Sequence, residues 1–152
     1  MNYSFGLLKP DCLKRGIQKE VIAMIESVGL EIIAIKRVRL TKKEIDIIWT
    51  SLSNEDFYEE FLKYCLSGDC MAFIVEGDDA IAKLNDLIGH YDPKRAEKHT
   101  IRHRFGRSVM ETVIHGAATE EAFWKEVSLF FTQPELNQLL TDLEPRGGVS
   151  KD

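Results

Sequence analysis

The sequence has few cysteines and no closely spaced pair of them. Its 152 residues include three cysteines, Cys12, Cys65 and Cys70, with no Cys-x-x-Cys among them. Three thiols cannot all pair within one chain, and their spacing matches no zinc-ligand pattern. A disulfide scaffold and a structural zinc site are therefore not expected. Reduced thiols in a cytoplasmic protein are the interpretation that this composition favours.

Long apolar runs are also missing. The stretch from Ile45 to Trp49 is among the longest, is interrupted by Asp46, and is far shorter than the roughly 20 residues that a membrane-spanning helix needs. The first residues, Met1 to Phe5, lack the basic start and apolar stretch of a secretory signal. We therefore expect no membrane partner and a cytoplasmic location.

Several common catalytic motifs are absent. The sequence contains no Gly-x-x-x-x-Gly-Lys-Ser/Thr loop and no Gly-x-Gly-x-x-Gly turn after a predicted strand. It also lacks a Gly-x-Ser-x-Gly elbow and a His-Glu-x-x-His helix. These absences argue against a P-loop kinase and a Rossmann-type dehydrogenase, and they provide no signature of a serine hydrolase or a zinc protease.

The charge balance argues against a nucleic-acid partner. The formal net charge is −5, so the chain has no global basic field. Basic side chains gather between Lys94 and Arg107, where six of them stand against the single acid Glu97. Such a run is commonly a solvated loop, and Phe105 is the only Phe, Tyr or Trp within it. The alternative, a functional loop, is supported because the run leads towards a histidine at the end of a predicted strand.

The pattern of apolar residues predicts one α+β domain. Apolar runs predict strands, whereas apolar residues at helical spacing between capping and glycine signals predict helices. In the strand expected at 30–40, Ile32, Ala34 and Val38 should share one face. The expected strands cover residues 3–8, 30–40, 70–75 and 112–115, and the expected helices cover residues 21–28, 41–52, 57–66, 78–88, 119–131 and 134–143.

The order of these elements contains the β-α-β-β-α-β pattern of a ferredoxin-like antiparallel sheet covered by helices. We expect the domain to span residues 1–144 and a polar tail to follow at 145–152. The stretch from Gly89 to about Glu111 shows no clean period. A connection of that length in a compact domain is more often functional than idle, so it is a candidate for part of a site.

His115 is the most informative single residue. It ends a predicted strand and precedes Gly116, which lets a ligand approach the backbone closely. Glu126 lies eleven residues later on the next predicted helix. A helix packed back on the strand would bring this carboxylate to one ring nitrogen and leave the other as a nucleophile. Lys9 and Arg102 would add the positive charge that phosphoryl transfer needs. On these residues alone, an ordinary structural histidine is the simpler interpretation.

Six short segments carry a resemblance to a known family. They are Leu8-Lys9-Pro10-Asp11, Arg15-Gly16, Tyr64-x-x-Ser67-Gly68, Glu76-Gly77, Thr100-Ile101-Arg102 and Val113-Ile114-His115-Gly116. In order and spacing, from Tyr3 to about Phe131, the chain resembles the nucleoside diphosphate kinases. A string of motifs of this kind is highly specific, and it favours a functional His115 over a structural one.

The resemblance implies a kinase that works by a ping-pong mechanism. His115 would accept the terminal phosphate of a nucleoside triphosphate and pass it to a nucleoside diphosphate, with Glu126 orienting the imidazole. Lys9 and Arg102 match residues that bind phosphates, and Phe57 matches the aromatic residue on which the base stacks. Stacking carries no donor and acceptor code, so broad base tolerance is expected. Magnesium would enter with the nucleotide, and a homo-oligomer, either hexamer or tetramer, is implied as well.

The chain departs from the family mainly within the expected nucleotide site. Four of the replaced positions contact phosphate or sugar in the family, while the nucleophile and its orienting acid are kept. We therefore expect altered specificity or efficiency rather than a loss of chemistry. The replacements are Trp49 for tyrosine, Asn85 for arginine, Tyr91 for threonine, Thr112 for asparagine, Ala117-Ala118 for Ser-Asp and Lys98-His99 for Pro-Gly.

Two other functions stay open on the sequence. One is a non-catalytic relative that binds a nucleotide or a protein partner, and the replaced positions are its support. The other is a specialised phosphotransferase that uses the same histidine on a different acceptor. Retention of His115, Glu126, Lys9 and Arg102 argues against the non-catalytic relative, because a scaffold has no chemical need for that set.

Overall fold

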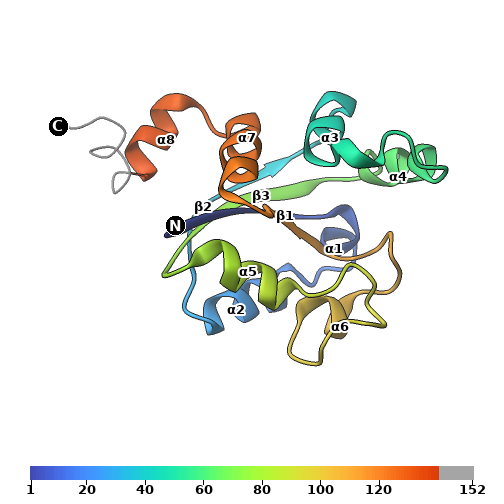
Figure 1. Ribbon diagram of the computed structural model, residues 1–152, viewed down its shortest axis with the longest axis horizontal. Coiled ribbons are helices and arrows are strands. Elements are labelled where there is room, and N and C mark those ends of the chain that lie inside the picture. The colour runs from blue at the N-terminus through green and yellow to red at the C-terminus, as the bar shows by residue number, and fades with distance from the viewer. Residues whose placement is uncertain (141–152) are drawn as a thin grey trace.

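The computed structural model describes residues 1–140, in which a sheet carries helices on both faces (Figure 1). The predicted end of the last helix near Leu143, the domain boundary at 144 and the tail at 145–152 lie outside the described residues. None of the described helices is long and apolar enough to cross a bilayer. In chain order the elements are β1 (Tyr3–Leu8), α1 (Pro10–Lys14), α2 (Gln18–Ser27), β2 (Glu31–Val38), α3 (Lys42–Ile48), the 3₁₀ helix η1 (Thr50–Leu52), α4 (Tyr58–Cys65), β3 (Cys70–Glu76), α5 (Ala80–Ile88), α6 (Ile101–Phe105), β4 (Ile114–Gly116), α7 (Glu120–Phe130) and α8 (Gln133–Leu139).

The four strands form an antiparallel sheet in the order β2-β3-β1-β4. The inner strand β1 pairs with β3 on one side and with β4 on the other, where Leu7 lies opposite His115. The connection from β1 to β2 runs through α2, and that from β3 to β4 runs through α5. This is the ferredoxin-like arrangement that the sequence predicts. It places His115 on an edge strand, directly beside the inner strand.

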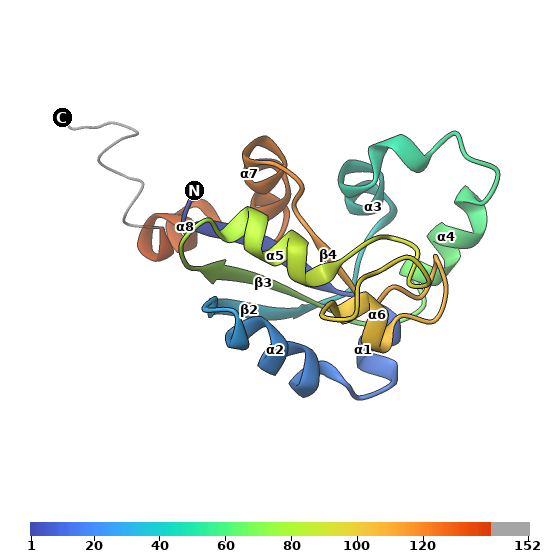
Figure 2. The same ribbon diagram turned by 60° about the horizontal axis from the view of Figure 1, so that its bottom comes forward.

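Two hydrophobic cores lie on opposite faces of the sheet. One contains Phe5 and Leu7 of β1 together with side chains of α3, α4, α7 and α8. The other contains Leu8 together with side chains of α1, α2, α5 and α6. Figures 1 and 2 show α3 and α7 on one side of the strands and α2 on the other. All six residues of β1 are buried, which explains why this strand does not alternate between apolar and polar residues.

The β2 strand corrects one expectation, because the residues predicted to share a face are divided between the two cores. Ile32 pairs with Val75 whereas Ala34 pairs with Ile74, so the register shifts by one residue between them. The extra residue, Ile33, forms a β-bulge. Ile32 therefore packs against the core beside α2, while Ala34 packs against the opposite one.

Two short helices were not among the predicted elements. In α1, Pro10 occupies the first helical position, where the missing N–H is no loss. In α6, the hydroxyl of Thr100 caps the helix by accepting a hydrogen bond from the His103 N–H at 3.1 Å. Each helix has only five residues, which is too short for apolar periodicity to reveal it.

The helix predicted from Thr41 to Leu52 is divided in two. It begins at the predicted capping box, in which the Thr41 hydroxyl accepts from the Glu44 N–H and the Glu44 carboxylate accepts from the Thr41 N–H. It ends early because Trp49 leaves the helical region, with φ −115° and ψ 53°. The chain resumes as η1. This break lies beside the candidate site, into which Trp49 projects.

Gly6 is required where the ring of Phe73 covers β1. A Cβ atom at position 6 would lie 2.2 Å from Phe73 Cζ. We expect Gly6→Ala to lower the free energy of unfolding by about 1–3 kcal/mol, because the ring must leave its packed position. Urea unfolding measures this change. The double variant Gly6→Ala/Phe73→Leu should lose less than the sum of the single variants, and strict additivity would show that the clash is not the cause.

Candidate active site

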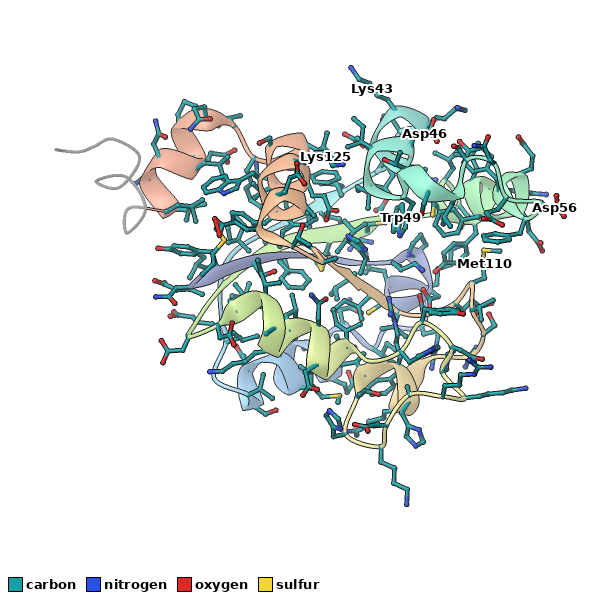
Figure 3. The ribbon with its side chains drawn as sticks, in the orientation of Figure 1. Lys43, Asp46, Trp49, Asp56, Met110 and Lys125 are labelled. Carbon is teal, nitrogen blue, oxygen red and sulfur yellow. The ribbon has the colours of Figure 1, made fainter. Side chains whose placement is uncertain are left out.

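A cleft of about 620 Å³ opens between the α3–α4 region and the segment that leads into β4. In Figure 3, Trp49 marks the α3 side and Met110 marks the opposing segment. The cleft brings together seven of the nine predicted site residues from six separate parts of the chain. Those seven are Lys9, Trp49, Phe57, Tyr91, Arg102, Thr112 and His115.

The imidazole of His115 is held by a buried carboxylate. Its Nε2 lies 2.8 Å from Glu126 Oε1, which is the contact that the spacing of eleven residues predicts. The Glu126 side chain is 4% exposed and that of His115 is 15% exposed, so the pair is largely shielded from water. Among the described residues, no polar group hydrogen-bonds to Nδ1 of His115. The arrangement therefore fixes one nitrogen and leaves the other for chemistry.

Trp49 packs against the histidine from the side of α3. The two ring centroids are 5.2 Å apart and the rings are inclined at 63°. The indole also meets Phe61 edge to face, with centroids 5.1 Å apart. These aromatic contacts limit the orientations open to the imidazole and exclude water from one of its sides.

Lys9 lies at the floor of the cleft and is 3% exposed. Its ammonium group donates to Thr112 Oγ1 at 2.8 Å and to the Met110 carbonyl at 3.2 Å. The rings of Trp49, Phe61 and Tyr64 lie within 6.0 Å of it, with centroids at 6.0, 5.8 and 5.4 Å. Burial lowers the pKa of Lys9 to about 8, although the nearby Asp11 opposes this change. The group stays mostly protonated at pH 7.

Arg102 is held in place by backbone carbonyls. Its guanidinium donates to Thr112 O at 3.4 Å, to Gly89 O at 3.0 Å and to Ile114 O at 2.7 Å. Burial lowers the pKa of Arg102 to about 10, so the group remains charged at neutral pH. A guanidinium has five N–H donors, and two of them are therefore left for a ligand. Lys9 and Arg102 give the cleft two fixed positive charges near His115.

The backbone before His115 is strained, and Asp11 holds it. Val113 has φ 73°, in the left-handed region that β-branched residues rarely adopt. Its N–H donates to Asp11 Oδ2 at 3.1 Å, and its carbonyl accepts from the Lys9 N–H at 2.8 Å. The other carboxylate oxygen of Asp11 accepts from the Tyr64 hydroxyl. This turn explains why β4 begins at Ile114 rather than at the predicted Thr112.

Comparison with known proteins assigns the chain to a family. The model of the nucleoside diphosphate kinase family matches residues 2–136. The chain belongs to the nucleoside diphosphate kinase family. A nucleoside diphosphate kinase of Saccharolobus islandicus is 35% identical over 136 residues, which cover 90% of this chain and 99% of the relative. One from Helicobacter pylori is 34% identical over 133 residues, covering 88% and 97%.

Solved structures of the family have the same fold. The nucleoside diphosphate kinase of Encephalitozoon cuniculi superposes with a TM-score of 0.84 at 30% identity, covering 89% of this chain and 92% of that one. The enzyme of Halobacterium salinarum, solved in complex with CDP, superposes with a TM-score of 0.83 at 27% identity, covering 89% and 91%. The predicted resemblance to this kinase family is therefore confirmed.

Three of the positions at which this chain is expected to differ from the kinase family have defined surroundings in the structure. Thr112 is buried, and its hydroxyl accepts a hydrogen bond from the ammonium group of Lys9. Tyr91 is 65% exposed at the cleft and stacks on His90, with centroids 4.5 Å apart. Asn85 does not line the cleft, because its amide donates to the Ala117 carbonyl at 2.9 Å. The Asn85 amide is thus engaged with the backbone and adds no polar group to the cleft.

Some residues in the cleft or beside it were not identified from the sequence. Asp11 and Tyr64 lie within the matched family segments, but the pattern alone assigns them no role. Glu60 and Met110 line the cleft and had no signal at all. An exposed glutamate on a short amphipathic helix looks like any solvated charge, so only the position of α4 in the fold reveals it.

The hydrogen bonds of Asp11 give a stability prediction. Asp11→Ala removes the acceptor of the buried Val113 N–H and of the half-buried Tyr64 hydroxyl, and we expect it to lower the free energy of unfolding by about 2–4 kcal/mol. Tyr64→Phe keeps the carboxylate and its bond to Val113, so we expect a loss of about 1 kcal/mol. Urea unfolding of both variants tests the assignment. Equal losses for the two would show that the bond to Val113 contributes little.

Proposed function

We propose that this chain is a nucleoside diphosphate kinase whose nucleophile is Nδ1 of His115. In the first half-reaction Nδ1 attacks the terminal phosphorus of a nucleoside triphosphate, and the P–O bond to the bridging oxygen breaks as the diphosphate leaves. In the second, a terminal oxygen of another nucleoside diphosphate attacks the same phosphorus and the P–N bond breaks. The observation that carries this proposal is the 2.8 Å contact between His115 Nε2 and Glu126 Oε1, since it fixes which nitrogen is free.

Glu126 has two functions in this mechanism. Its carboxylate accepts a hydrogen bond from the Nε2–H, which keeps the lone pair on Nδ1 and orients the ring. When Nδ1 bonds to phosphorus, the imidazole gains positive charge, and the buried carboxylate stabilises that charge in a site of low dielectric. Trp49 supports the same ring from the side. Glu126 therefore acts on both the ground state and the transition state.

Lys9 and Arg102 bind the phosphates in this proposal. Phosphoryl transfer gains its rate mainly from positioning and from positive charge around the moving group, and these are the two cations fixed near His115. Phe57, at the open end of the cleft and 44% exposed, offers a face on which a base can stack. Tyr91 can donate its hydroxyl proton to a phosphate, whereas Thr112 acts through Lys9.

Magnesium belongs to the substrate in this proposal. Within residues 1–140 no three acidic, histidine or cysteine side chains are grouped to hold a metal ion. Mg²⁺ commonly keeps several water ligands and binds substrate phosphates, with few ligands from the protein. A cleft whose floor is cationic suits an ion that arrives on the nucleotide. Bound there, magnesium would neutralise phosphate charge, while Lys9 and Arg102 orient the phosphates.

The proposal also includes the oligomeric state and the cellular location. We propose a homo-oligomer, a hexamer or a tetramer, on the basis of the family, and light scattering measures its mass. A cytoplasmic location is supported by the cysteines, since Cys12, Cys65 and Cys70 are all free and buried.

Labelling of His115 tests the kinase directly. The purified protein is incubated with γ-labelled ATP and magnesium, and we expect label that is lost in acid, is stable in alkali and is absent from His115→Ala. Addition of nucleoside diphosphates should then transfer the label from the protein to the diphosphate. Glu126→Gln keeps the shape but loses the charge, and we expect its labelling rate to fall by ~100-fold.

The outcomes separate the functions that the sequence left open. Label that forms but does not transfer to any nucleoside diphosphate would point to a phosphotransferase with another acceptor. Binding of ATP without label would contradict the kinase and favour a non-catalytic relative. Label that persists in His115→Ala would place the nucleophile elsewhere.

The pKa of Lys9 predicts how nucleotide binding depends on pH. With a pKa of about 8, the ammonium is mostly charged at pH 7 and mostly neutral at pH 9. Phosphates need the charged form, so we expect the affinity for ADP to fall by ~10-fold between these values. Arginine cannot deprotonate in this range, and Lys9→Arg should flatten the profile. Calorimetric titration at each pH measures the affinity, and a flat profile for the unmodified protein would contradict the assignment.

A further inference from the structure

The cleft is polarised from its floor to its mouth. Lys9 is 3% exposed and Arg102 is held by three carbonyls, so both cations lie at the buried end, where His115 also lies. Glu60 is the one carboxylate among the lining residues, and it is exposed. A negative charge at the open end repels phosphate and the positive charges at the floor attract it. The phosphates of a bound nucleotide therefore point inward and its base lies near the mouth.

Glu60 shares a face of the α4 region with the stacking residue. Phe57 immediately precedes α4, and Glu60 follows it by three residues, which puts the two side chains on one side about one helical turn apart. Both line the cleft. In Figure 3, Asp56 marks the outer end of this region, and Trp49 lies nearer the sheet. A base stacked on Phe57 would thus present its edge towards Glu60.

The carboxylate of Glu60 has no other task in the described structure. A glutamate at this helical position commonly caps the helix by accepting from the backbone N–H, but α4 has no side-chain cap. Among the described residues it has no hydrogen bond or ion pair. A favourable interaction with the helix dipole is the remaining ordinary explanation, and Glu59 in the same first turn would share it. Glu59 does not line the cleft, so the two acids differ in one relevant respect.

A carboxylate is an acceptor only, and the bases differ in what they offer it. Guanine carries adjacent donors at N1–H and the 2-amino group. Adenine and cytosine each carry one amino group next to an acceptor nitrogen. Uracil and thymine present one N–H between two carbonyl oxygens, which a carboxylate repels. The order of preference at such a group is guanine first, adenine and cytosine next, uracil and thymine last.

We propose that Glu60 determines base specificity in this cleft, favouring guanine nucleotides and disfavouring those of uracil and thymine. The inference rests on the proposed function for the orientation of the nucleotide. It replaces the broad base tolerance expected from stacking on Phe57 alone. The carboxylate distinguishes the bases by their hydrogen-bond donors, whereas stacking on Phe57 does not distinguish them.

The experiment compares acceptors rather than absolute rates. With ATP as donor, kcat/KM is measured for GDP, IDP, CDP, UDP and TDP in the unmodified protein, Glu60→Gln, Glu60→Ala and the control Glu59→Gln. We expect GDP to exceed UDP by ~10-fold, since a partly solvated charge-assisted hydrogen bond is weaker than a buried one. Glu60→Ala should reduce this ratio to ~2-fold, with a gain for UDP. IDP, which lacks the 2-amino group, should fall between GDP and UDP.

The controls distinguish this inference from simpler roles and from the kinase itself. Glu59→Gln removes the same charge from the same helical turn but lies outside the cleft, so it should keep the GDP to UDP ratio. A Glu60→Ala effect that is uniform across all bases would overturn the proposal in favour of a role in the helix or at the metal. If no diphosphate is phosphorylated, the proposed kinase fails, and calorimetric affinities for GDP and UDP then test Glu60 alone. Equal affinities would overturn the inference.

Discussion

The carboxylate of Asp11 joins parts of the chain that are far apart in sequence. It accepts from Tyr64 on α4 and from the Val113 N–H, 53 and 102 residues away. A buried carboxylate is costly unless its oxygens are satisfied, and these bonds offset that cost. The bond from the Val113 N–H also stabilises the left-handed turn at Val113. Backbone strain of this kind costs on the order of 1–3 kcal/mol. The position of His115, two residues later, depends on this turn, as do two of the carbonyls that bind Arg102.

The site combines the His115–Glu126 pair with two cations, Lys9 and Arg102. His115 and Glu126 lie on β4 and α7, which the two cores hold rigidly against β1. Lys9 immediately precedes α1 and Arg102 lies on α6, whereas the amide of Asn85 on α5 binds a backbone carbonyl outside the cleft. In the proposed kinase, substrate binding would rely on Lys9, on Arg102 and on contacts near the mouth of the cleft.

Much of the fold and of the reaction centre was predictable because the signals are local or strongly periodic. The apolar run of β1, the capping box at Thr41 and the interval from His115 to Glu126 each depend on a few neighbouring residues. The bulge at Ile33 and the left-handed turn at Val113 were not predictable, because partners distant in sequence impose them. Glu60 escaped for a related reason, since its relevance depends on where α4 lies and not on its own surroundings in the sequence.

Arg102 acts as a cross-link within the long connection between α5 and β4. Its guanidinium joins Gly89, where that connection begins, to Thr112 and Ile114, where it ends. The guanidinium therefore closes the intervening residues into a ring. The same guanidinium is proposed to hold phosphate, so a bound nucleotide would favour the closed ring by mass action. In this way, binding of a nucleotide would also stabilise the folded form of this connection.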